Sequence, residues 1–424
     1  MEILTTGEKI KRTRIYKGLT LKELCGDKIS VSKLSCIEND KAEAEPEILR
    51  YIAKILDMDY KYLVDNISNQ ISRNIEELKN IDISRDNNLM DLQYNLNYAV
   101  ENQCYSQAFT LMHMLYDYYL IKEQKDDLQK LTSQYVDILN KTNSSENRVT
   151  YLFDVGRYFF ISEEYSQALT YYNGAEKYAA KCNDVIISQI LYIVQCEIKC
   201  MLNMNNYTMA EAKVMELEEV IVNNPGITEA EMADIYHTIA IVYFKNNKDK
   251  FIEFSDKAIE AFGDNYYSKC NALCDYSVLC FRAGEMQEGL KYINKGIGLF
   301  PRDNSEEQAR YFIEAIGQLI KYEFIDEAEE ICDDALNLSI ILDNNIFIER
   351  SYYYKSIIML KKGEFSSAEM YMNLSSDALF KYASKRERYE RYIELGSMYH
   401  KINQTKEAIK YFSLALKIKR SLAI

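Results

Sequence analysis

Residues 10–40 read IKRTRIYKGLTLKELCGDKISVSKLSCIEND, and the spacing of caps and apolar residues in this stretch predicts short helices separated by tight turns. A first helix is expected from Gly7 to Tyr16, because Thr6 can accept a hydrogen bond from its first turn as the N-cap. Ile10 and Ile15 are expected on its inward face. The N-terminal part of the chain therefore begins as a small helical domain.

Two further helices follow from the cap residues. Gly18 suits the left-handed residue that ends the first helix, and Thr20 with Glu23 forms the reciprocal pair of a capping box at the start of a second helix. Ser30 is placed to cap a third helix, whose inward side carries Leu34. The stretch thus predicts two short helices joined by a tight turn.

The third helix has a polar outward face. Short helices with small, hydrogen-bonding side chains on the second of the pair are typical of a motif that enters the DNA major groove. Phosphate contacts are expected from the second helix. The candidate DNA-binding residues are Thr20, Lys22, Ser30, Val31, Ser32, Lys33, Ser35 and Cys36.

Charge is distributed in a way that fits contact with nucleic acid at one small surface. The 424 residues carry a formal charge of −14. Residues 1–34 hold eight Lys or Arg and four acids, residues 35–66 hold four bases and eight acids, and the whole excess of acid lies downstream. A basic edge on an acidic body favours phosphate contact by the edge alone.

These residues resemble the lambda-repressor-like helix-turn-helix family, also called the Xre type, over about residues 7–65. The resemblance implies that Arg14 pairs with Glu38 to hold the helices together rather than to read bases. Leu21 replaces the usual glutamine, so one familiar phosphate contact is not expected, and Asp40 replaces the usual glycine. The alternative is a helix-turn-helix retained for contact with protein. The matching residues are Arg14, Gly18, Leu19, Thr20, Glu23, Leu24, Ser35, Ile37, Glu38, Asn39 and Leu63.

From residue 90 onward a two-helix pattern recurs. A small residue on one helix is followed by an aromatic residue, and then by Ala on a second helix with apolar residues four and seven positions later. Gly156, Ala168 and Tyr172 show the pattern, and average spacing is about 40 residues. Such pairs bury their faces only by stacking on their neighbours. The second-helix anchors are Ala108, Ala168, Ala210, Phe251, Gly289, Ala328, Ala368 and Ala408.

This repeat resembles the tetratricopeptide repeat, so we expect an all-α fold: a lambda-repressor-like helix-turn-helix domain followed by a right-handed superhelix of helix pairs. The whole layout resembles the RRNPP quorum-sensing receptors of Gram-positive bacteria, and most nearly the clostridial RstA-like regulators of sporulation and toxin genes. The resemblance implies a cytoplasmic homodimer that binds a promoter inverted repeat in double-stranded DNA and a short signalling peptide. An alternative is a Rap- or NprR-like regulator that acts through protein contacts on a sporulation response regulator or kinase. A third possibility is a protein scaffold that makes no contact with DNA.

The first helix of each pair is expected to line a concave groove. Its Asn and Gln side chains can both donate to and accept from a peptide backbone, and its Arg side chains can take a carboxylate. The alternative is that these polar groups only face water. The candidate peptide-binding residues are Asn97, Arg157, Gln195, Lys199, Asn203, His237, Asn271, Asp275, Arg310, Arg350 and Tyr353.

We predict three parts: residues 1–66 form the DNA-binding domain, 67–88 a linker helix, and 89–424 the peptide-binding and dimerisation domain. An apolar stripe along the linker is expected to pack on the body or on a twin molecule. It consists of Ile67, Ile71, Ile75 and Leu78.

Several functions are not expected from the sequence. It contains no phosphate-binding glycine loop, no nucleophile elbow and no zinc-protease motif, so we predict neither an enzyme nor a cofactor. Ten cysteines lack a Cys-x-x-Cys spacing and the three histidines lie apart, which indicates no clustered metal ligands. Cys196/Cys200 and Cys270/Cys274 could be linked, but small core residues are favoured. No secretory leader or bilayer-spanning run is present, so no membrane contact is expected.

Overall fold

The computed structural model describes residues 2–80, 86–142, 144–182, 187–224, 226–300 and 305–421. Within these ranges the chain forms helices and turns and no strand. None of the helices found there combines the length and the apolar character needed to cross a bilayer. The chain forms two compact units, Met1–Pro225 and Gly226–Ile424. The all-α prediction is confirmed for the described residues.

Five short helices, which we call the head, occupy the N-terminal end of the first unit. A compact apolar core joins them, with Ile10, Leu24, Leu34 and Ile52 fully buried. Their bounds are α1 Thr6–Tyr16, α2 Leu21–Cys25, α3 Val31–Glu38, α4 Pro46–Ile55 and α5 Tyr60–Val64.

The caps in the head largely follow the sequence. Gly18 has φ +69°, Thr20 and Glu23 form a capping box, and the Ser30 hydroxyl accepts the Lys33 N–H. The start of α1 was predicted wrongly, because the N-cap is Thr5. The Thr5 hydroxyl accepts a hydrogen bond from the Glu8 N–H at 3.1 Å, and the Glu8 carboxylate accepts one from the Thr5 N–H.

One inward-facing residue of α1 was also predicted wrongly. Ile15 is 60% exposed, whereas Ile10 is fully buried. In a helix, residues five apart lie about 140° apart around the axis, so Ile15 cannot share the core-facing side with Ile10. Ile15 instead lies beside the exposed Tyr16 at the end of the helix.

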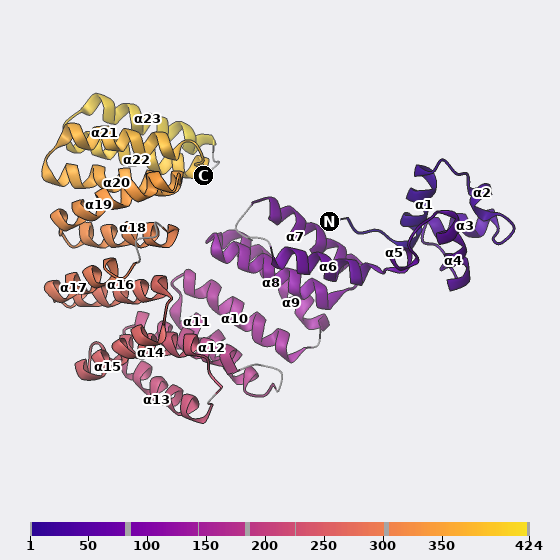
Figure 1. Ribbon diagram of the computed structural model, residues 1–424, viewed down its shortest axis with the longest axis horizontal. Coiled ribbons are helices and arrows are strands. Elements are labelled where there is room, and N and C mark those ends of the chain that lie inside the picture. The colour runs from indigo at the N-terminus through magenta and orange to yellow at the C-terminus, as the bar shows by residue number, and fades with distance from the viewer. Residues whose placement is uncertain are drawn as a thin grey trace. The chain divides into compact units, whose positions relative to one another are not determined.

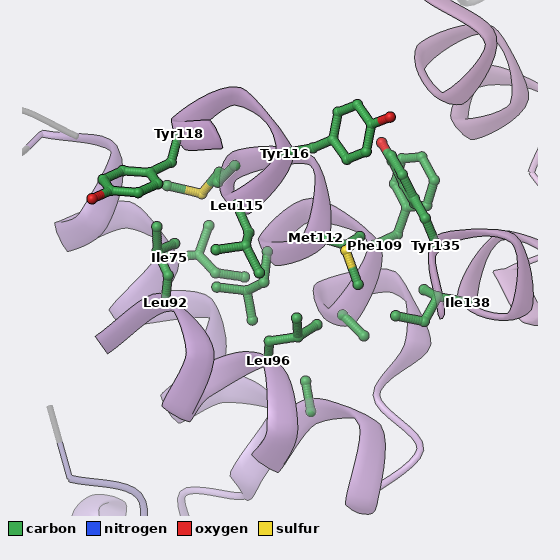
Figure 2. Close-up of a cluster of buried hydrophobic side chains, with 14 of the residues drawn as sticks. Ile75, Leu92, Leu96, Phe109, Met112, Leu115, Tyr116, Tyr118, Tyr135 and Ile138 are labelled. Carbon is green, nitrogen blue, oxygen red and sulfur yellow. The ribbon is translucent and has the colours of Figure 1, made fainter. Parts of the chain in front are cut away.

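The stripe in the linker packs on the chain's own body. Helix α6 spans Ile67–Lys79, and Ile71, Ile75 and Leu78 enter a core with α7 Asp86–Glu101 and α8 Tyr105–Ile121. Figure 2 shows Ile75 beside Leu92 of α7 and Leu115 of α8. The intrachain alternative is confirmed. Part of the predicted 67–88 linker, residues 81–85, lies outside the described ranges.

The remainder of each unit consists of tetratricopeptide-like helix pairs. In the second unit Figure 1 shows the pairs stacked in chain order. The helices of the first unit are α9 Lys125–Thr142, α10 Ser145–Ile161, α11 Tyr165–Ala179, α12 Ile187–Asn203 and α13 Tyr207–Asn223. Those of the second are α14 Glu229–Tyr243, α15 Lys248–Ala261, α16 Tyr266–Arg282, α17 Met286–Ile297, α18 Glu306–Lys321, α19 Ile325–Ile341, α20 Asn345–Lys362, α21 Phe365–Leu379, α22 Lys385–Lys401 and α23 Thr405–Ser421.

The predicted repeat anchors recur at one helical position. Each is the fourth residue of the second helix of its pair, from Ala108 in α8 to Ala408 in α23, and each is buried. Helix α9 interrupts the alternation, since it lies between the pairs α7/α8 and α10/α11 and packs on both α8 and α10. All ten cysteines are free thiols, and the four in i,i+4 pairs are buried, which confirms their assignment to the core.

Candidate functional site

The predicted DNA-binding residues lie on α2, on α3 and at the caps that begin them. Thr20, Lys22, Ser30, Ser32 and Lys33 are exposed. Val31 is 45% exposed at the first position of α3. The head therefore presents one short polar surface, which we call the α3 face, defined by Thr20, Lys22 and residues 30–33.

Two predicted residues contribute less to this face than expected. Ser35 and Cys36 are half-buried, and the Ser35 carbonyl accepts a hydrogen bond from the Asn39 side chain.

The Thr20 hydroxyl already accepts the Glu23 N–H at 3.2 Å and donates to the Glu23 carboxylate at 2.7 Å. Its hydroxyl is thus committed to capping α2.

A two-point ion pair fixes the orientation of α3. Arg14 Nε and Nη2 donate to the two carboxylate oxygens of Glu38 at 2.6 and 2.8 Å. Arg14 Nη1 also donates to the Leu19 carbonyl at 2.9 Å, which ties the same guanidinium to the turn before α2. The Glu38 side chain is 3% exposed. This geometry confirms that Arg14 and Glu38 join helices and do not face outward.

The lysines around the α3 face differ in their ionic partners. Lys33 Nζ lies 3.2 Å from Glu45 Oε1. Lys22 and Lys28 form no ion pair with any residue in the described ranges. Lys22 is therefore free to bind an external anion, whereas Lys33 must first break its ion pair with Glu45.

The first unit also contains a small pocket between helices α8, α10, α11 and α12, which we call the α8–α12 pocket. Its volume is about 220 Å³. Arg157 and Lys199, two predicted peptide-binding residues, are its only charged lining residues. The others are Leu120, Ile121, Phe160, Ile161, Tyr172, Tyr192 and Cys196.

Arg157 belongs to a set of polar side chains centred on Asp154, which is fully buried, while His113, Asp117 and Arg157 are partly exposed. Asp154 Oδ2 accepts a hydrogen bond from Tyr135 Oη at 2.6 Å and lies 2.7 Å from His113 Nδ1. His113 Nε2 is 3.5 Å from Asp117 Oδ2, and Asp117 is ion-paired to Arg157 Nη1. We call these five residues the Asp154 network.

Within the network the pKa values of Asp154 and of His113 are both raised. Burial raises the pKa of the Asp154 carboxyl, although hydrogen bonds from His113 and Tyr135 oppose the shift. Burial alone would lower the pKa of His113, but its hydrogen bond and attraction to Asp154 outweigh this effect and raise it.

His113, Asp117 and Asp154 bring possible metal-ligand atoms within 4.8 Å of one another. The prediction that no clustered ligand set exists was therefore wrong. Asp154 lies on α10, so only helix packing places it beside the i,i+4 pair His113/Asp117 of α8. The cationic Arg157 already pairs with Asp117 and lies 3.7 Å from Asp154 Oδ1. A divalent cation would be repelled by this guanidinium, and we assign no metal site.

The other candidate peptide-binding residues of the first unit have unequal access. Asn97 on α7 and Lys199 on α12 are exposed, while Gln195 is buried. The Asn203 side-chain amide donates to the Lys199 carbonyl at 2.8 Å, which occupies one of its donors within its own helix. Lys199 and Arg157 are thus the candidates that the structure brings together here.

In the second unit the candidates form two local groups. His237 Nδ1 lies 3.0 Å from Tyr276 Oη, and His237 Nε2 lies 3.2 Å from Asp275 Oδ2. On the same helix as Asp275, the buried Asn271 Oδ1 has no hydrogen-bond partner within the described ranges. This first group joins α14 to α16.

The second group lies on α18 and α20. Arg310 sits 5.9 Å from the centre of the Phe347 ring. Arg350 is exposed, and Tyr353 Oη donates to Glu394 at 3.1 Å. The predicted set is therefore distributed over separate local clusters, five members in the first unit and six in the second.

No protein-family model matches the chain, and no curated protein matches it in sequence. Similar solved structures include PlcR of Bacillus thuringiensis in complex with the peptide PapR7 and DNA, at 12% identity over 61% of this chain and 94% of PlcR, with a TM-score of 0.34. The apo quorum sensor NprR of Bacillus thuringiensis is 15% identical over 84% of this chain and all of NprR, with a TM-score of 0.40. A Rap protein complexed with Competence and Sporulation Factor is 13% identical over 84% of this chain and 99% of that protein, with a TM-score of 0.42. At these values the similarities carry no argument about this chain.

Proposed function

We propose that this protein is a DNA-binding transcriptional regulator whose helical-repeat body binds a short signalling peptide. The observation that carries the proposal is the α3 face, held in one orientation by the Arg14–Glu38 pair. A short helix with exposed serine and lysine at its N-terminal end suits the major groove, where such side chains contact base edges.

The roles of the head residues follow from their exposure. Val31, Ser32 and Lys33 are at the outer surface of α3 and would face base edges. Lys22, which has no ionic partner in the described ranges, would neutralise a phosphate. With so few contacts, one head reads a short half-site, so a homodimer on an inverted repeat is part of the proposal.

The body would supply the control. Exposed polar groups such as Asn97 and Lys199, together with the α8–α12 pocket, offer hydrogen-bonding and apolar surface to an extended peptide. A peptide changes DNA binding only if it binds one arrangement of the chain more tightly than another. Control of sporulation or toxin genes is included in the proposal because of the sequence resemblance described above.

Genome-wide immunoprecipitation of the tagged protein, compared with a variant lacking residues 1–65, tests the proposal. Discrete promoter peaks that disappear in the truncated variant are expected. Absence of peaks in both would contradict the proposal and favour a regulator that acts through protein contacts on a response regulator or kinase.

Gel shifts on a recovered promoter then test the face itself. The double variant Ser32→Ala/Lys33→Ala is expected to lose specific binding. The matched control Ser166→Ala/Lys177→Ala changes two exposed residues of α11 and is expected to bind as the unaltered chain does. Equal binding by both double variants would exclude α3 as the reading helix.

A further inference from the structure

The α8–α12 pocket is the size of a single residue. At about 220 Å³ it is smaller than the 300–1,000 Å³ clefts that enclose whole small ligands. Arg157 and Lys199 are its only charged lining residues, the other side chains are aliphatic, aromatic or cysteine, and they come from four helices of one unit. It therefore suits one residue that combines an apolar side chain with a negatively charged group beside it.

Arg157 is held with one edge of its guanidinium unused. Nη1 is ion-paired to Asp117 and lies 3.7 Å from Asp154 Oδ1. Within the described ranges neither Nε nor Nη2 makes a hydrogen bond. Those two donors form the edge that binds both oxygens of a carboxylate at once. Asp117 thus pairs with Nη1, and the Nε/Nη2 edge has no hydrogen-bond partner among the described residues.

The Asp154 network fixes Arg157 before any ligand arrives. Asp117 is a positioning residue, since it holds Nη1 and is itself 3.5 Å from His113 Nε2. The buried Asp154 in turn accepts the Tyr135 hydroxyl and contacts His113. Because a preorganised arginine loses less side-chain entropy on binding, this network strengthens an interaction with an anion.

A second cation completes the charge pattern. Lys199 is exposed on α12, lines the same pocket and forms no ion pair among the residues described. A carboxylate would give Lys199 a counterion and the free Nε/Nη2 edge of Arg157 an acceptor, whereas an uncharged amide would leave Lys199 without a counterion; Arg157 keeps its pairing with Asp117 in either case.

We propose that the α8–α12 pocket binds the C-terminal residue of a short peptide. The apolar side chain of that residue occupies the cavity, its α-carboxylate receives hydrogen bonds from Arg157 Nε and Nη2, and Lys199 Nζ supplies the second positive charge. This assignment rests on the proposed peptide-binding function and names the end of the peptide that the first unit recognises.

Two synthetic heptapeptide libraries test it with the full-length protein. Both are randomised at six positions and end in Leu, one as the free acid and the other as the C-terminal amide. Peptides retained by the immobilised protein are counted by mass spectrometry. The acid library is expected to be retained about tenfold more than the amide library, a ratio that corresponds to about 1.4 kcal/mol.

Variants assign the preference to the pocket. Arg157→Gln is expected to abolish the preference for the acid, and Lys199→Gln to reduce it. Ile121→Glu places a carboxylate at the rim from a residue that is 60% exposed, so it repels the acid without disturbing the core. Lys177→Gln, an exposed lysine outside the pocket, is the matched control and keeps the full preference. Helical content by circular dichroism checks the folding of each variant.

The outcomes separate this inference from the proposed function. Equal retention of acids and amides that is unchanged by Ile121→Glu would overturn the pocket assignment but leave peptide binding intact. Retention of neither library would overturn both the pocket assignment and peptide control, whereas promoter binding would still be judged by immunoprecipitation. N-acetyl-leucine competing as well as the best acid peptide would overturn the peptide as occupant and favour a free apolar acid.

Discussion

The ring of Tyr172 lies directly against Gly156, so that a Cβ built on Gly156 would be 2.5 Å from Tyr172 Cε1. Gly396 and Phe412 repeat this contact in the second unit, with a Cβ-to-Cδ1 distance of 2.6 Å. In both cases a glycine of the first helix of a pair meets an aromatic ring of the second. The repeat therefore requires a small residue at this position because the aromatic ring fills the space that a side chain would occupy. Tyr172 also lines the α8–α12 pocket.

Gly156→Ala is expected to destabilise the first unit by about 1–3 kcal/mol, because the added methyl group displaces the buried Tyr172 ring. Gly174→Ala is the matched control, since its Cβ would meet Leu152 Cδ1 at an ordinary 3.6 Å and alanine favours the helix. Unfolding by urea, followed by circular dichroism, measures both. Equal stability of the two variants would show that the ring moves aside freely.

Glu38→Gln is expected to destabilise the head by about 3 kcal/mol, since it leaves the Arg14 guanidinium without its buried counterion. Amide hydrogen exchange should accelerate in α1 to α3 and remain unchanged in α10 to α13. Arg12→Gln breaks the exposed pair with Glu2 and is expected to change no exchange rate. Similar exchange in both variants would mean that the Arg14–Glu38 pair does not hold α3.

Glu45→Gln is expected to increase promoter affinity about two- to fivefold at low salt, because Lys33 no longer exchanges a carboxylate before meeting DNA. The gain should shrink as salt rises, since screening weakens exposed charges. Glu47→Gln, which removes an exposed acid that has no ion pair within the described ranges, controls for total charge. An equal gain from both variants would assign the effect to net charge alone.

Glu197 gives the first unit a distinctive pH dependence. Burial raises the pKa of its carboxyl to about 7, even though Lys213 Nζ lies 3.0 Å away. The carboxyl has a pKa of about 4.3 in the unfolded chain and about 7 in the folded one. Between these pH values the folded state binds more protons than the unfolded state, so the stability of the fold falls as the pH rises through this window.

Glu197→Gln should flatten that fall, which urea midpoints at several pH values between 5 and 7.5 would measure. Glu216→Gln is the control, because Glu216 pairs with the same lysine at 3.3 Å but its side chain is 69% exposed. If the unaltered chain and Glu197→Gln lost stability in parallel across the window, Glu197 would not be the group responsible.

Local sequence was sufficient for the helices and for several contacts. The capping residues Thr20 and Ser30, the left-handed Gly18 and the recurring anchors appear as predicted because each depends on neighbours within one or two turns. The errors at Thr5 and Ile15 are of one turn or less. The predicted domain boundaries and site roles remain predictions.

The candidate site was only partly visible in the sequence. Arg157 and Lys199 could be named from their helical positions, but nothing in the spacing linked Asp154 to His113, which lies 41 residues earlier. His113 and Asp117 stand in a strongly apolar helix, and their i,i+4 spacing was the one available signal of a polar network.

The sequence by itself determined that this protein is built of helices in pairs and that its N-terminal 65 residues differ from the rest, while the family resemblance implied that Arg14 and Glu38 meet. Capping, periodicity and small-residue spacing are local properties, so they can be read along the chain. Only the tertiary structure decided that α6 packs on its own body, that Gly156 accommodates Tyr172, and that Arg157, ion-paired to Asp117, lines a pocket. These relationships depend on which helices pack together, because burial and electrostatic contact join residues that sequence distance separates.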